Sequence, residues 1–349
     1  MQEVKLYSHD EAIYMIAGGV FHIFRPIFPN NPKSETEKVS ASKKYIAWAI
    51  ILLVLLTLPM WASNYITLIF FLSLLYMAFG QMWNLLAGYA GLVSLGQQIF
   101  IGLGGYSLAV LTELYGLPIW FAMLAGGVFG CLFALVSAKF LFRMKGVFFT
   151  IATWITAEAV LVYFSNWRFV RMGQGLFVRA AYTFSNSDLY YIALGLGLGS
   201  ILLVSWILRS KLGLGLMAMR DNEDAAETVG VEIFRSKMYC YLIASFVTGV
   251  IGSVFYLNQA FIQPYAAFSI SWTVAAVFLV IIGGIGTVEG PILGAVIYVF
   301  LQQYLSAYAG LSMLILGAIA LILILAAPRG IIGTLQEKTG FHLFSFRRT

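Results

Sequence analysis

The sequence has little charge. Of its 349 residues, 10% are charged and 61% are hydrophobic, whereas a soluble domain is usually about 25% charged and about 45–50% apolar. A water-soluble chain of this length would have too few polar residues to cover its surface. The composition therefore excludes a soluble enzyme and a nucleic-acid-binding protein, and it indicates a polytopic membrane protein embedded in the lipid bilayer.

Histidine and cysteine are also scarce. The three histidines, His9, His22 and His342, lie outside the hydrophobic part of the chain, and Cys131 and Cys240 lie in separate apolar runs. Neither a paired metal motif nor a disulfide framework can be recognised. There is also no G-x-x-x-x-G-K-[ST] motif, the loop that cradles nucleotide phosphates. We therefore expect no metal or cofactor to be bound by this chain.

Long apolar runs dominate what is present. A helix needs about 20 apolar residues to cross a membrane, and on this basis we predict an all-α fold with about ten transmembrane helices. Glycine and small polar residues interrupt the third run and the eighth is short, so either segment could be broken or re-entrant. The predicted spans are 45–62, 65–86, 90–111, 118–142, 146–166, 188–208, 238–258, 270–285, 290–307 and 311–327.

The basic residues predict the orientation. Of the 21 lysines and arginines, all except Arg168, Arg171 and Arg179 fall on one side of the membrane if the N-terminus is inside, and an excess of positive charge marks the cytoplasmic side. Both termini are therefore predicted to be cytoplasmic. Because this charge is spread along one membrane face, it does not indicate nucleic acid as a partner. We divide the chain into a predicted cytoplasmic segment 1–44 with a short interfacial helix, a transmembrane domain 45–328 and a cytoplasmic tail 329–349.

The most polar cytoplasmic loop, 209–237, contains a predicted short helix. Asp221 is a candidate N-cap with Asp224 three residues later, and Gly230 can end the helix in a left-handed turn. Ala225, Ala226 and Val229 would give the helix a small apolar face. Such a helix can dock into a groove of a cytoplasmic partner, although an ordinary solvated loop helix would have the same composition.

Three segments of the chain carry a family resemblance. In the cytoplasmic loop, Asp224-Ala225-Ala226 followed by Gly230 resembles the E-A-A-x-x-x-G coupling loop of ABC importer permeases, with Asp in place of Glu. The surrounding RDNEDAAETVGVEIFRSK, together with NLLAGYAGLVSLGQQ from Asn84 and GGIGTVEGPILGA from Gly283, resembles the branched-chain amino acid permease family. The pattern covers about 84–335 and is closer to the LivM type than to the LivH type.

The resemblance implies a translocation subunit of an ATP-driven importer in the inner membrane of a prokaryote. Its partners would be a second, LivH-like permease, two ABC ATPase subunits that hold the ATP and Mg²⁺, and an extracytoplasmic substrate-binding protein. The substrate would be a branched-chain or related hydrophobic amino acid, with urea, short amides or aromatic acids as alternatives within the family. The residues that would contact the ATPase are Arg220, Asp221, Glu223, Asp224, Ala225, Ala226, Glu227 and Gly230.

Polar side chains inside the apolar runs are candidates for the substrate path. Asn84, Ser94, Gln97 and Gln98 lie in or beside a glycine-rich stretch, where a helix can break inside protein. The alternative for each is helix packing with polar groups bonded between helices. Glu158 lies well inside a predicted span, where a carboxylate is costly unless paired or hydrated. It could face the path or stabilise a contact between helices.

Two extracytoplasmic segments are candidates for docking of the binding protein. Arginines in 167–187 would suit an acidic partner surface, although an interfacial aromatic belt is an equally good interpretation of that segment. The loop 258–269 is the second candidate. The docking residues that we predict are Arg168, Arg171, Arg179, Gln259 and Gln263.

Two other classes of function are weighed against the importer. An ion-coupled carrier or channel usually has several intramembrane charged residues, and this sequence offers Glu158. An integral-membrane enzyme needs a cluster of reactive side chains at one face, but no His or Asp lies well inside a predicted span. The importer is therefore the favoured prediction.

Overall fold

The computed structural model describes residues 49–305, 312–326 and 330–339. The predicted segment 1–44 and residues 340–349 of the predicted tail lie outside the described residues. The chain divides into two units, 1–57 and 58–349. The described residues of the first unit lie in a short apolar helix, Ala49–Trp61.

The described residues of the second unit are mainly helical. Two two-residue strands, which the all-α prediction did not include, pair antiparallel with Leu176 opposite Ile262. The helices and strands in chain order are α3 (Asn64–Asn84), η2 (Leu85–Tyr89), α4 (Gln98–Glu113), α5 (Ile119–Leu141), α6 (Val147–Asn166), η3 (Arg168–Val170), β1 (Leu176–Phe177), η4 (Arg179–Thr183), α7 (Asn186–Arg209), α8 (Lys211–Asp221), α9 (Glu223–Thr228), α10 (Ile233–Gln259), β2 (Phe261–Ile262), α11 (Pro264–Ala267), α12 (Ser271–Gly283), α13 (Gly290–Leu305), α14 (Ser312–Ala326) and α15 (Gly330–Thr339).

Six helices of the described chain are long and apolar enough to cross a membrane. They match the second, fourth, fifth, sixth, seventh and eighth predicted spans, and their bounds are Asn64–Tyr89, Ile119–Leu141, Val147–Asn166, Asn186–Arg209, Ile233–Gln259 and Pro264–Gly283. The first of these combines α3 with η2, and the last combines α11 with α12 across the short turn 268–270. The first and ninth predicted spans correspond to the shorter apolar helices Ala49–Trp61 and Gly290–Leu305, and the tenth corresponds to α14. The prediction of a polytopic helical membrane protein is therefore confirmed.

The third predicted span, 90–111, is not a continuous helix. Residues 91–97 are non-helical, and α4 begins only at Gln98. The backbone groups freed by this break find partners: the Trp83 indole donates to Ser94 O (3.0 Å), the Thr150 hydroxyl donates to Val93 O (2.8 Å), and Leu95 N donates to the Thr153 hydroxyl (3.0 Å). Irregular backbone is tolerated at membrane depth only where it is satisfied in this way.

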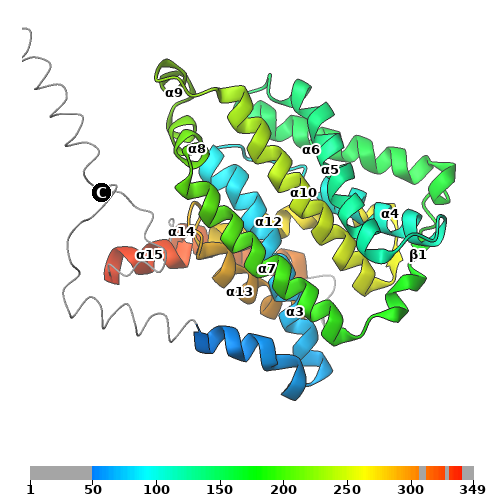
Figure 1. The fold of residues 1–349 in the computed structure, drawn as a ribbon. Coiled ribbons are helices and arrows are strands. Elements are labelled where there is room, and N and C mark those ends of the chain that lie inside the picture. The colour runs from blue at the N-terminus through cyan, green and yellow to red at the C-terminus, as the bar shows by residue number, and fades with distance from the viewer. Residues whose placement is uncertain (1–48, 306–311, 327–329, 340–349) are drawn as a thin grey trace, which may run out of the picture. The chain divides into compact units, whose positions relative to one another are not determined.

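Helix α10 lies between several other helices and packs most extensively on α4 and α5 (Figure 1). The packing is close because glycines face one another. A Cβ added at Gly104 of α4 would lie 1.9 Å from the carbonyl oxygen of Gly249 in α10. Backbones that approach this closely are typical of helix contacts in membranes, where small residues form the interface. α10 and α4 are therefore held in close contact.

Candidate functional site

The segment 209–237, predicted to be cytoplasmic, folds as two short helices, α8 and α9, ahead of α10. The prediction of Asp221 as the N-cap is wrong: Asp221 is the last residue of α8, and its carboxylate accepts hydrogen bonds from Arg220 (3.1 Å). Asn222 caps α9 instead, and its side-chain oxygen accepts from Ala225 N at 3.0 Å. The cap moves because the chain turns one residue later than the pattern of acids indicated, so Asp224 has no capping-box position. Gly230 has a φ of +88°, which confirms the predicted left-handed turn after the helix.

One face of α9 is open and the other is buried. Asp224, Ala225, Glu227 and Val229 are exposed, and Val229 is 77% exposed although it is apolar. Ala226 was predicted to share an apolar face with Ala225 and Val229, but it is 2% exposed and belongs to the hydrophobic core. The predicted apolar face is therefore divided, because the helix also has to pack against its own chain. What remains outside is an acidic face with apolar Ala225 and Val229 beside the charges.

A buried ion pair connects α9 to α10. The Lys237 ammonium lies 2.5 Å from a carboxylate oxygen of Glu223, and their side chains are 4% and 28% exposed. Lys145, in the loop between α5 and α6, lies 3.4 Å from Asp224 and 4.0 Å from Glu223. Sequence reasoning did not include Lys237 or Lys145 in the site. The available signal was a lysine just inside an apolar helix, which burial forces to find a counter-ion.

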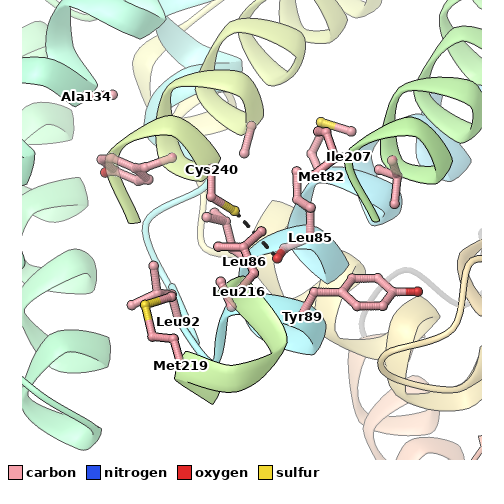
Figure 2. Packing of buried hydrophobic residues seen from close by; sticks show 14 of the residues in the cluster. Met82, Leu85, Leu86, Tyr89, Leu92, Ala134, Ile207, Leu216, Met219 and Cys240 are labelled. Atoms are coloured by element: carbon pink, nitrogen blue, oxygen red, sulfur yellow. Dashed lines mark hydrogen bonds between the residues drawn. The ribbon is translucent and has the colours of Figure 1, made fainter. Parts of the chain in front are cut away.

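Arg220 connects the same segment to the membrane-embedded helices. Its guanidinium donates to Gly88 O at 2.9 Å, in the π-helical turn η2 that ends α3. Figure 2 shows the apolar side of this connection: Leu216 and Met219 of α8 pack with Leu86 of η2 and Cys240 of α10 in one buried cluster. The candidate coupling residues therefore sit on a segment that is anchored to α3 and α10 by both polar and apolar contacts.

Of the polar residues predicted for the path, Asn84 and Ser94 hold backbone in place. The Asn84 amide donates to Thr287 O and accepts from Gly286 N, both at 2.8 Å, and so fastens the turn between α12 and α13 to α3. The Ser94 hydroxyl accepts from Gly96 N at 3.2 Å within the broken segment. Both side chains are used in structural hydrogen bonds.

Gln97 and Gln98 differ from these two. Both are fully buried, and their side-chain oxygens accept from the hydroxyls of Thr248 in α10 and Thr273 in α12. Their Nε2 groups find no hydrogen-bond partner within the described residues. A buried amide with an unused donor is unfavourable unless something else accepts from it. These two donors lie where α4 begins, at the end of the broken segment.

Glu158 does not join these glutamines. It lies on an exposed part of α6, and one of its oxygens accepts from the Trp154 indole at 3.1 Å. The Glu158 carboxylate therefore lies on the outer side of this chain.

The two predicted docking segments lie side by side at the opposite end of α10 from α9 (Figure 1). Strand β1 follows Arg168 and Arg171, strand β2 lies between Gln259 and Gln263, and the strands pair with each other. Val178 N also donates to Ala260 O at 2.8 Å. The backbone and side chain of Arg179 contact Glu113 at the end of α4, so part of its charge is compensated. No pattern in the sequence indicated that these two segments would pair.

The chain is similar in sequence to known membrane permeases. Residues 64–327 match the family described as branched-chain amino acid transport system / permease component. The high-affinity branched-chain amino acid transport system permease protein LivM of Escherichia coli (strain K12) is 26% identical, over 89% of this chain and 82% of LivM. The probable branched-chain amino acid transport permease protein LivM of Methanocaldococcus jannaschii is 24% identical, over 66% of this chain and 69% of that protein.

A permease named for a different substrate is also similar. The L-arabinose ABC transporter permease protein AraH of Azospirillum brasilense is 23% identical, over 59% of this chain and 61% of AraH. No solved structure is significantly similar to the chain. Because the family match covers most of the chain, including every transmembrane helix of the candidate site, the chain belongs to the permease-component family of branched-chain amino acid transport systems, as a transport subunit that is not itself a catalyst.

Proposed function

We propose that this chain is the transmembrane permease subunit of an ATP-driven importer for branched-chain or related hydrophobic amino acids. The observation that carries the proposal is α9, an exposed acidic helix at one end of α10, fastened to that helix by the Lys237–Glu223 pair. Its partners would be a second permease subunit, two ABC ATPase subunits and an extracytoplasmic binding protein. ATP and Mg²⁺ would bind to the ATPases, and this chain would hold no cofactor.

In this proposal α9 receives the movement of the ATPase. Asp224, Ala225, Glu227 and Val229 form the contact face, and Gly230 sets the angle at which the chain leaves it. The buried ion pair passes the movement to α10, and Arg220 passes it to η2. Because helices in close contact move as units, a shift of α10 changes its contact with Gln97 through Thr248.

The path would pass the unused amide donors of Gln97 and Gln98. A zwitterionic amino acid carries a carboxylate, which accepts hydrogen bonds strongly. Urea and short amides also carry an acceptor, as do aromatic acids, and they remain the alternative substrates within the family. An ion-coupled secondary transporter is a more distant alternative.

The topology that we propose has ten crossings, with both termini on the cytoplasmic side of a prokaryotic inner membrane. One contact supports this arrangement: Lys145 of the α5–α6 loop reaches Asp224 of α9, so two loops that were assigned to the same side lie together. Arg168, Arg171 and Arg179 follow α6 at its other end. At 1.5 Å per residue, the 20 residues of α6 separate these loops by about 30 Å.

The paired strands and the arginines before them would receive the binding protein. Replacing Arg168 and Arg171 by glutamate is expected to weaken binding of the binding protein at least tenfold, because the charges steer and hold an acidic surface. The measurement is titration of the binding protein against the assembled transporter in nanodiscs, at low and at physiological salt. The matched control is Arg235→Glu, at the opposite end of α10. Undiminished affinity of the double variant would remove these arginines from the docking surface.

The proposal itself is tested by isolating the tagged chain from membranes in mild detergent and identifying what accompanies it. A second permease and ATPase subunits are the expected companions. Gly230→Pro combined with Asp224→Lys should release the ATPases and leave the permease pair, because proline cannot adopt the positive φ of Gly230 and the lysine reverses the charge of the contact face. A wild-type chain that is stable and alone would refute the importer function, and uptake driven by an ion gradient would then be the next measurement.

A further inference from the structure

Helix α6 has the least buried surface of the six candidate membrane spans. Only 22% of its most apolar stretch is buried, against 33–78% for the others. Its buried residues, Phe149, Thr153, Ala157 and Phe164, lie along one side of the helix. The opposite side is not covered by the described part of this chain.

The open side of α6 forms one continuous stripe. Phe148, Ile151, Ile155, Glu158 and Val162 follow one another at intervals of three or four residues, so they share a face. All five are exposed, Phe148 at 75% and Ile155 at 61%. The stripe is therefore apolar with a single carboxylate, and that carboxylate lies eleven residues after Val147 and eight before Asn166, close to the middle of the helix.

This carboxylate is poorly satisfied in the isolated chain. It accepts one hydrogen bond, from Trp154, whereas a carboxylate has about four acceptor positions. No lysine or arginine among the described residues forms an ion pair with it. Eight residues of helix separate it from the nearer end, or about 12 Å. A charged group that faces lipid at this depth is strongly disfavoured and is usually paired or hydrated inside protein.

We propose that this face of α6 is the surface on which the second permease subunit packs, and that the partner places a basic or hydrogen-bond-donating side chain against Glu158. The inference rests on the proposed function, and it adds where the two permeases meet. An apolar stripe alone would suit lipid equally well, but the carboxylate requires a polar partner. The open stripe of α7 differs in this respect: Tyr191, Leu202 and Trp206 are exposed there, and no ionisable acid or base lies between them.

The first test uses a photo-crosslinking residue, benzoylphenylalanine, at Ile155 and, as the matched control, at Leu202. The transporter is expressed with all its subunits and illuminated in native membranes. We expect crosslinking from Ile155 to the second permease and none to it from Leu202. Crosslinks from Ile155 only to another copy of this chain, or to no protein, would overturn the inference.

The second test measures the role of the carboxylate. Glu158→Leu is expected to reduce recovery of the second permease at least tenfold in mild detergent, while the melting temperature of the purified chain stays within a few degrees. Glu158→Gln, which can still accept a hydrogen bond, should retain more of the pair. Full recovery with Glu158→Leu would overturn the role of the charge. If the wild-type complex contains the second permease and the ATPases but Ile155 does not crosslink to it, this inference fails while the proposed function stands.

Discussion

Replacing Glu223 by alanine is expected to uncouple the transporter and lower ATP-driven uptake at least tenfold. The change leaves the Lys237 ammonium, whose side chain is 4% exposed, without the carboxylate that lies 2.5 Å from it. Removing one member of a buried ion pair typically costs about 3–5 kcal/mol, and the lower end applies here because Glu223 is partly exposed. The change also removes the direct bond between α9 and α10, through which the movement of the ATPase would reach the membrane helices.

The two members of this pair should not be equivalent. Lys237→Met is expected to have a smaller effect on stability. The Glu223 side chain is 28% exposed, so its carboxylate remains solvated, and it still has the Lys145 ammonium 4.0 Å away as a counter-ion. The double variant Glu223→Ala/Lys237→Met should recover the stability lost in Glu223→Ala, since no buried charge remains unpaired. Its uptake should stay low, because the connection is still missing.

Two measurements separate these effects: the melting temperature in detergent and ATP-driven uptake into reconstituted vesicles. Glu232→Ala is the matched control, since the Glu232 and Arg235 side chains form an exposed pair, at 63% and 70%, in the same segment. Such a pair contributes about 0–1 kcal/mol, so uptake and stability should both be nearly unchanged. If the double variant regains full uptake, the pair stabilises the fold but does not carry the movement.

Gln97→Met and Gln98→Met are each expected to lower uptake at least tenfold without lowering stability. Methionine has a similar volume, and it removes an amide whose Nε2 has no partner among the described residues. Removing an unsatisfied buried donor is neutral or stabilising for the fold, and each threonine hydroxyl can turn to a backbone carbonyl three or four residues earlier in the chain. A fall in transport at constant stability would therefore mean that the donors serve the substrate.

Asn84→Leu provides the opposite comparison. Its amide bonds Gly286 N and Thr287 O, and leucine would leave both of these backbone groups unpaired. Each such group costs about 1–3 kcal/mol, so the variant should yield less folded protein and melt at a lower temperature. If the two glutamine variants are destabilised as much as Asn84→Leu, Gln97 and Gln98 are structural and the path lies elsewhere.

In the glycine-rich segment, the sequence predicted the break in the helix but not the role of each polar side chain. The glycines and amides of 88–106 predicted a break, and residues 91–97 are indeed non-helical. The composition suggested four candidates for the substrate path in or beside this segment, but it did not distinguish between them. The structure separates them by hydrogen bonding: Asn84 and Ser94 hold backbone, whereas Gln97 and Gln98 keep unused donors. Which polar group is satisfied depends on residues far away in the chain, such as Thr287, and a local pattern does not contain that information.

Local sequence features were sufficient to predict the class of protein, most of the membrane spans, the short helix in 209–237 and its end at Gly230. These features depend on local composition, on the length of apolar runs and on backbone preferences, which short segments of chain carry. Contacts between distant parts of the chain determine four other features: Asn222 caps α9, Ala226 faces inward, β1 pairs with β2, and Lys237 is buried against Glu223. The fold also leaves Glu158 exposed on the outer side of α6. Each of these depends on which distant helix covers which face, because burial and pairing are set by the neighbours that the fold supplies.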